Sequence, residues 1–144
     1  MSFIGVRLSL YNTINAIKTS AGIQTLCNYN PVELGATPAV LILPERSGEQ
    51  IITTDENESS IRFVIRVLVQ NTNDPSTQTT SVLTVTDAIM AELRKNDNES
   101  LAGTCHYFLM EEITPVMYGE FAEVKVMYQD IVITAKTLMS ISTP

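Results

Sequence analysis

The sequence predicts an α+β fold in which a single, mostly antiparallel sheet is covered on one face by two helices. Residues 61–70 carry an apolar side chain at every odd position, which is typical of a strand with one fully buried face. Residues 6–21 and 75–95 instead carry apolar residues at helical spacing. Turn signals join the remaining strands, so we expect antiparallel pairing and the order α-β-β-β-α-β-β.

The first helix is expected to stop at Ala21-Gly22. The following residues 22–37 hold Asn, Pro and Gly among scattered apolar residues, and we interpret them as an irregular crossing segment. Residues 38–44 form a short apolar run bracketed by prolines, which favours a strand at or near a sheet edge. The apolar stripe of the first helix is Val6, Leu10, Ile14 and Ile17.

Residues 45–60 are polar and acidic, and we interpret them as a protruding hairpin. Ser47-Gly48 and residues 55–58 are its two turn signals, and residues 51–54 are a possible strand. A hairpin with so few apolar residues stabilises itself poorly, so we expect it to be mobile unless another chain orders it.

The second helix is expected to begin with Asp74 as its N-cap and Pro75 at its first helical position, where a missing backbone donor does no harm. Arg94 and Lys95 near its end meet the negative pole of the helix dipole. Its apolar stripe is Val82, Val85 or Thr86, Ile89 and Leu93.

Residues 104–113 and 121–134 predict a long antiparallel hairpin joined by residues 114–119. The second of these strands alternates as a half-buried strand does. Ala122, Val124, Val126, Tyr128 and Val132 share one face, and Glu123, Lys125, Met127 and Gln129 share the other.

Length and charge limit the kinds of function. A chain of 144 residues fits one domain, residues 1–144, with a core of its own. The formal charge of −7 opposes wrapping by nucleic acid, because phosphate binding needs clustered Lys and Arg. No apolar run reaches the ~18 residues of a membrane span, and the N-terminus has no secretory pattern, so we expect cytoplasmic synthesis.

The residues that suggest chemistry are poorly arranged for it. Cys105 and His106 are neighbours on an expected strand and face opposite ways, as do Glu111 and Glu112. Cys27 and Cys105 are expected to be reduced thiols, and the six glycines are too scattered for a phosphate loop. We expect no catalytic residue, no metal site and no cofactor.

Arg62 and Arg66 project from the even face of residues 61–70, away from the helix layer. Two cations on one strand face can pair with Glu111 or Glu123 across the sheet, or with carboxylates of a neighbouring subunit. Both alternatives fit the sequence.

The whole pattern resembles the tail terminator, or tail completion, proteins of long-tailed bacteriophages. The resemblance covers nearly the full chain and rests on the N-terminal helix, residues 38–44, the polar hairpin, residues 61–70, the helix through residues 87–93, and residues 101–103 leading into the final hairpin. It implies one domain with a protruding hairpin at about residues 45–60 and no enzymatic activity.

By this resemblance we expect a virion structural protein, assembled in the host cytoplasm and located at the tail–neck junction. Its copies would form a hexameric ring that ends polymerisation of the tail tube protein and joins the head/neck connector, with DNA passing through the lumen. The residues that we expect at a subunit or tube interface are Glu45, Arg46, Glu49, Asp55, Glu56, Glu58, Arg62 and Arg66.

Two other functions fit the same sequence. A head–tail connector or neck protein differs only in its partner, the portal assembly instead of the tail tube. A small ligand-binding α+β domain would need an apolar pocket with a few convergent polar groups.

Overall fold

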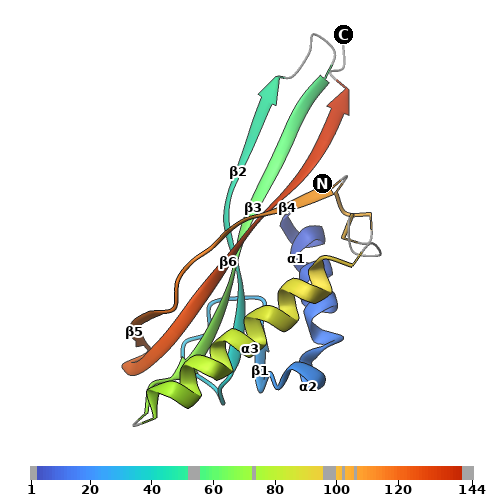
Figure 1. Cartoon of the computed structure of the whole chain (residues 1–144). Coiled ribbons are helices and arrows are strands. Elements are labelled where there is room, and N and C mark those ends of the chain that lie inside the picture. The colour runs from blue at the N-terminus through green and yellow to red at the C-terminus, as the bar shows by residue number, and fades with distance from the viewer. Residues whose placement is uncertain are drawn as a thin grey trace.

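An open sheet backed by helices forms the domain (Figure 1). The computed structural model describes residues 3–51, 56–72, 74–95, 100–101, 103–105 and 107–140, and it describes side chains for these except 46–51, 56–58 and 138–140. The described chain forms three helices and six strands. They are α1 (Phe3–Asn15), α2 (Lys18–Ala21), β1 (Thr25–Cys27), β2 (Ala39–Ile51), β3 (Glu56–Gln70), α3 (Pro75–Leu93), β4 (Tyr107–Ile113), β5 (Met117–Phe121) and β6 (Val124–Ser140).

The strands lie in the order β1-β2-β3-β6-β4, and β5 pairs with the first part of β6. Among the described strand pairs, only β1 and β2 run parallel, and Thr25 lies opposite Ala39. The α+β class, the mostly antiparallel sheet and the order of elements are therefore as predicted from the sequence.

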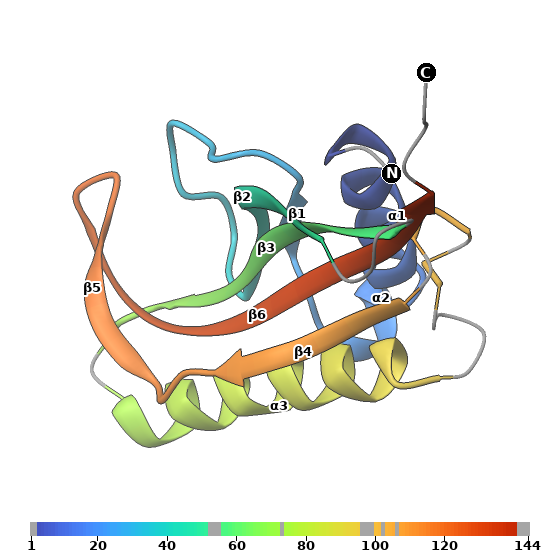
Figure 2. The same ribbon diagram turned by 90° about the horizontal axis from the view of Figure 1, so that it is seen from above.

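The main core lies between the sheet and the helices, which Figure 2 shows on one side of the strands. Phe63, Ile65 and Val67 are fully buried there, as the odd positions of residues 61–70 predicted. Ile89 of α3 and Leu10 of α1 meet them from the helix layer. The predicted stripes of both helices are buried, with Ile17 partly so and with Val85 and Thr86 both inward.

A smaller cluster covers part of the opposite face of the sheet, called here the outer face. Leu41, Leu68 and Val126 are buried in it, and Tyr128 packs at its border. The alternation was predicted correctly from Val124 onward, but Ala122 and Glu123 precede β6, and the burial of both faces of the strand was not predicted. Met127 lies in the main core, while the even positions pack in this second cluster.

The first helical segment is interrupted after Asn15 and resumes as α2, which ends at Gly22 in the left-handed conformation. The expectation of an irregular segment over residues 22–37 was wrong for Thr25–Cys27, which is strand β1. Three residues carry too little periodicity to reveal a strand, and pairing with β2 supplies the missing stabilisation. Cys27 therefore ends a strand, not a loop.

The outer parts of β2, β3 and β6 extend beyond the helices (Figure 1). Residues 46–51, 56–60 and 137–140 make this extension, called here the arm. Ser47-Gly48 was predicted as a turn but lies within β2, opposite Ile61 and Ser60. Residues 56–58 likewise belong to β3, and residues 52–55 lie outside the described residues. The prediction had a two-stranded hairpin here, whereas in the structure β6 pairs with β3 and forms a third strand.

β2 also continues past Pro44, where the sequence predicted its end. The ladder with β3 shifts register between Pro44 and Arg46, which marks a bulge. β1 pairs only as far as Leu41, so β2 has an open edge at Pro44 and a missing backbone donor is tolerated there.

The α3 helix begins as predicted, with Asp74 accepting a hydrogen bond from the backbone N–H of Thr77 at 3.3 Å. The final hairpin differs from the prediction in three ways, the third being a turn inside the predicted strand 121–134. Residues 104–105 precede β4 instead of belonging to it, and much of the expected connection, residues 117–119, is part of β5. Ala122 and Glu123, both with positive φ, form the turn between β5 and β6.

Candidate interaction surfaces

The outer face of the sheet carries both candidate arginines. Arg66 is the ladder partner of Asp130 on β6, and Arg62 is the partner of Thr134. Because paired residues of antiparallel strands point to the same face, both arginines project from the same face of the sheet as Asp130 and Thr134. The structure brings each of them to a carboxylate of the same chain.

Arg66 makes the better ion pair. Its Nε donates to Oδ1 of Asp130 at 2.8 Å and its Nη2 donates to Oδ2 at 2.9 Å. Its guanidinium also lies 4.8 Å from the ring centre of Tyr128. The hydrogen bond to Asp130 is the main reason that the pKa of Arg66 is raised. This geometry fixes β3 against β6.

Arg62 lies between two acidic side chains. Its Nε is 3.1 Å from Oε2 of Glu45, and its Nη1 is 3.7 Å from Oε2 of Glu111. The Nε atom is buried but is not aligned as a hydrogen-bond donor to Glu45, so the attraction is mainly coulombic. Pairing with Glu111 within the chain was one of the two alternatives predicted from the sequence.

Four of the remaining predicted interface residues belong to the arm, and Glu45 directly precedes it on β2. Glu45 is exposed and joins Arg62, as described above. The side chains of Arg46, Glu49, Glu56 and Glu58 and the whole of Asp55 lie outside the described residues. The backbone places Arg46 and Glu49 on β2 and places Glu56 and Glu58 on β3.

Asp130 and Tyr128 were missed by the sequence reasoning. Asp130 is the only acidic residue after Glu123, and it stands inside an otherwise apolar strand. A carboxylate is rarely buried without an ion-pair or hydrogen-bond partner. A lone Asp in an apolar strand was therefore the sequence feature that could have indicated a pairing of this kind.

β4 and β5 share the free edge of β6 and leave a gap between them. Thr114 fills this gap, since its N–H donates to the carbonyl of Asp130 and its hydroxyl accepts from the N–H of Asp130, both at 3.0 Å. The side chain of Gln129 donates to the carbonyl of Thr114 at 2.9 Å. The two short strands therefore continue one edge of the sheet.

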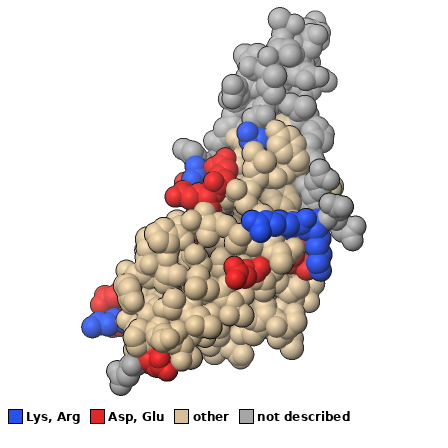
Figure 3. All heavy atoms as spheres, viewed as in Figure 1, with Lys and Arg blue, Asp and Glu red and all other residues tan. Residues whose placement is uncertain are grey.

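A bulge at Glu111 changes the faces of β4. It places Glu112 opposite Val132, which is a residue of the outer face. Glu111 reaches Arg62 on the same face, so the expected opposite orientation of Glu111 and Glu112 was wrong. Both carboxylates are exposed, and Figure 3 shows acidic side chains beside the base of the arm.

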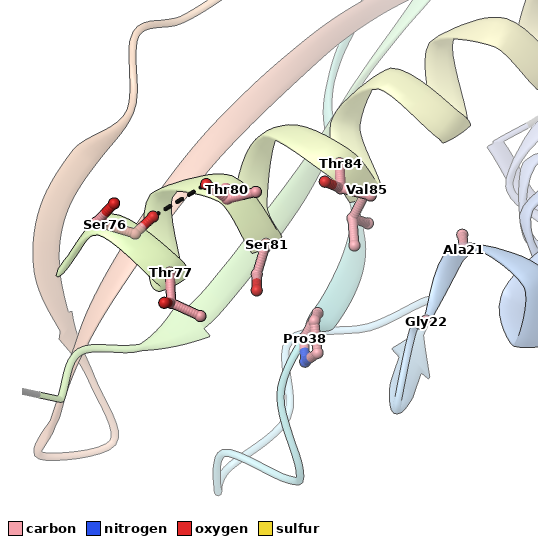
Figure 4. A pocket seen from close by; sticks show the side chains of 9 residues that line it. All are labelled: Ala21, Gly22, Pro38, Ser76, Thr77, Thr80, Ser81, Thr84 and Val85. Atoms are coloured by element: carbon pink, nitrogen blue, oxygen red, sulfur yellow. Dashed lines mark hydrogen bonds between the residues drawn. The ribbon is translucent and has the colours of Figure 1, made fainter. Parts of the chain in front are cut away.

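A shallow hollow of about 430 Å³ lies where α2, the start of β2 and the first half of α3 meet (Figure 4). Thr80 donates its hydroxyl to the carbonyl of Ser76 at 3.0 Å, so part of the polar lining is engaged within α3. None of the described residues that line this hollow is charged or aromatic, so a ligand would meet hydroxyl groups, aliphatic carbon and backbone there. The lining residues are Ala21, Gly22, Pro38, Ser76, Thr77, Thr80, Ser81, Thr84 and Val85.

The two cysteines are free thiols and both are buried. Cys105 donates to the carbonyl of Ser100 at 3.5 Å, and burial raises the pKa of its thiol. His106 lies outside the described residues. Within the described ranges, no three His, Cys, Asp or Glu residues gather closely enough to hold a metal ion.

No helix in the described part of the chain is both long and apolar enough to cross a membrane. Searches of protein-family models and of curated proteins find no match to this chain.

Proposed function

We propose that the protein is a phage tail terminator, a structural virion protein that forms a ring on the end of the tail tube. In this role a hexamer of the chain stops the addition of tube protein and presents a joining surface to the head/neck connector. The ring is assembled in the host cytoplasm and stays at the tail–neck junction, and DNA passes through its lumen without sequence-specific binding.

The arm is the observation that carries this proposal. A three-stranded extension projects beyond the helices that cover the core of the domain. Beyond Leu41, the edge of β2 that faces away from β3 has no partner strand within the described chain, so the backbone donors and acceptors of that edge face outward. Such an extension is suited to contact with an adjacent subunit or with the tube.

The outer face near Arg62 forms the base of this contact. Arg62 is partly buried, Glu45 and Glu111 are exposed, and the three side chains already form a small charged network. Substituting both Arg62 and Arg66 would also remove the internal pair with Asp130, so it would mix a folding effect with an assembly effect. Substitutions in the arm test the interface more cleanly.

The test uses purified protein and purified tail-tube protein, with light scattering and negative-stain imaging. We expect a mass near six subunits, or rings on the tube ends that stop tube growth. A monomer that leaves tube growth unchanged would contradict the proposal. Binding to the portal assembly instead of the tube would indicate a neck protein.

The arm is tested with the triple variant Glu49→Lys, Glu56→Lys and Glu58→Lys. We expect it to fold normally and to lose tube capping. Glu33→Lys combined with Asp87→Lys is the control, because both residues are exposed and lie outside the arm. Equal capping by the triple variant and the control would exclude the arm from the tube contact.

A further inference from the structure

The open edge of β2 in the arm presents backbone groups, and the ladders of the sheet show which residues supply them. At Asp130 of β6, the N–H donates to the hydroxyl of Thr114 and the carbonyl accepts from the N–H of Thr114, both at 3.0 Å. Asp130 therefore turns its backbone groups toward the edge that β4 and β5 share. Successive residues of a strand bond to opposite neighbours, so even-numbered residues of β6 face this edge and odd-numbered residues bond to β3.

The same alternation continues through β3 to β2. Odd-numbered residues of β3 are the ladder partners of odd-numbered residues of β6 and bond to them, so even-numbered residues of β3 bond to β2. Gly48 is the partner of Ser60 and therefore bonds to β3. Its neighbours along β2 point their N–H and carbonyl groups the other way. The residues of the arm that supply the open edge of β2 are thus Ser47, Glu49 and Ile51.

The position of Pro44 agrees with this assignment. Leu43 is the partner of Val64 and bonds to β3, so Pro44 faces the open edge, where its missing N–H breaks no ladder bond. The bulge then inserts Glu45 and shifts the alternation by one residue. Pro44 and the bulge interrupt the open edge at its base only, and the backbone donors beyond them are intact.

β1 shows what this edge of β2 accepts. Thr25–Cys27 comes from a stretch with little periodicity, yet it pairs in parallel with β2 on the side away from β3. Past Leu41 no further strand of the described chain occupies that side. Figure 1 shows this part of β2 clear of the helices. The edge therefore has room for a second short strand in line with β1.

The charge of the arm limits what such a strand can be. Its acidic residues are Glu49, Glu56 and Glu58, and its single basic residue is Arg46. Lys136 lies at the base of the arm, and Glu45 is already paired with Arg62. The arm itself thus carries a surplus of negative charge, and an added strand that contains Lys or Arg meets complementary charge there.

The other edge of this chain does not supply a strand of that kind. Within the described residues, β4 contains Glu111 and Glu112 and no basic residue, and β5 contains Glu120 and no basic residue. Residues 137–140 of β6 are uncharged. Charge complementarity therefore favours a strand from another protein over a strand from a second copy.

We propose that an extended, basic segment of the tail-tube protein adds to the outer edge of β2 as a further strand over residues 46–51. The backbone groups of Ser47, Glu49 and Ile51 bond to it, and the acidic surplus of the arm selects its charge. This inference rests on the proposed function and deepens it, because it names the atoms and the partner chemistry through which the arm holds the tube.

Proline substitution tests the backbone contact. Ser47→Pro removes one outward N–H, while the bonds to β3 stay in place, as they do at Pro44. We expect this variant to bind purified tail-tube protein about 10-fold more weakly or worse in a co-sedimentation assay. Ser47→Ala is the matched control, because it loses the same hydroxyl but keeps the N–H, and it should bind like the wild type. Circular dichroism and urea unfolding check that both variants are folded.

Amide hydrogen exchange gives a second readout, measured by mass spectrometry at single-residue resolution. Tube binding should slow exchange at the three outward residues, Ser47, Glu49 and Ile51. Gly48 should change little, because its N–H is already bonded to β3. Unchanged exchange at the outward residues in the tube-bound protein would overturn the inference.

A short synthetic peptide of alternating valine and lysine tests the charge of the added strand without the tube. We expect it to bind the wild type and Ser47→Ala, and to bind Ser47→Pro about 10-fold more weakly or worse. The matched peptide of alternating valine and glutamate should not bind. Equal binding of the two peptides would remove charge selection from the inference.

The results also separate this inference from the proposed function. A Ser47→Pro variant that caps tubes like the wild type would overturn the inference and leave the terminator role intact. A wild type that ignores the tube but binds the lysine peptide through Ser47 would support the edge and remove the role. Loss of the ring by Ser47→Pro in the absence of tube would place a second copy on this edge and overturn the basic partner.

Discussion

Arg66 and Asp130 are ladder partners on β3 and β6 and form an ion pair through two hydrogen bonds of 2.8 and 2.9 Å. The Asp130 side chain is 11% exposed, so it has little water to replace the guanidinium. The pair lies beside the point where β6 passes from β5 to β4. It therefore joins β3 to β6 between the two stretches of β6 that pair with β5 and with β4.

Removing the cation should be costly. Arg66→Met leaves the Asp130 carboxylate without its partner, and we expect the free energy of unfolding to fall by about 2 kcal/mol, less than for a fully buried pair because Arg66 is partly exposed. Urea unfolding followed by circular dichroism measures this loss. The double variant Arg66→Met with Asp130→Leu should recover most of the stability. Equal losses in both variants would argue against the unpaired charge as the cause.

Gly119 of β5 allows the ring of Tyr128 to lie close to the backbone. A Cβ at this position would be 3.0 Å from Cε1 of Tyr128. The guanidinium group of Arg66 also contacts the Tyr128 ring. We expect Gly119→Ala to lower the free energy of unfolding by about 1 kcal/mol. In a Tyr128→Leu background the same substitution should cost less. An unchanged cost would indicate a backbone effect unrelated to the ring.

Gly22 tests backbone conformation without a steric contribution. Its φ is 79°, in the left-handed region, and an added Cβ would meet no atom within 4 Å. Gly22→Ala should therefore cost about 1 kcal/mol from the conformation alone, and Gly22→Asn should cost less. Thermal unfolding of the two variants measures the difference. A larger loss for Asn than for Ala would contradict this explanation.

The sequence was most informative where one periodicity ran without interruption. The odd positions of residues 61–70 and the stripe through Val82, Ile89 and Leu93 correctly identified the buried faces. Asp74 was recognised as an N-cap because its role depends on residues only three positions away. These features are local, so the sequence alone can reveal them.

The features that were missed depend on distant pairing. Ser47-Gly48 has strong turn character, but continuous pairing with β3 overrides it. Asp130 is 64 positions from Arg66, and no local pattern connects them. The bulge at Glu111, which brings Glu112 to the outer face, follows from the pairing of β4 with β6. The outward faces of β4 could therefore not be assigned before the strands were placed.

Asp74 connects the stability of α3 to pH. Its Oδ1 accepts from the N–H of Thr77 and its Oδ2 accepts from the hydroxyl of Thr77 at 2.7 Å, and these hydrogen bonds lower the pKa of the carboxyl below its ordinary value. A lowered pKa in the folded state means that the stabilisation is fully present above the ordinary pKa. It is lost as the pH falls through the lower, folded pKa.

Asp74→Ala should therefore reduce stability at neutral pH, and the difference from the wild type should shrink in acid. Asp74→Ser is the matched control, because its hydroxyl can cap Thr77 without titrating. Urea unfolding at several pH values from neutral to strongly acidic measures both differences. A gap between wild type and Asp74→Ala that stays constant into strong acid would show that the carboxylate form is not what stabilises the start of α3.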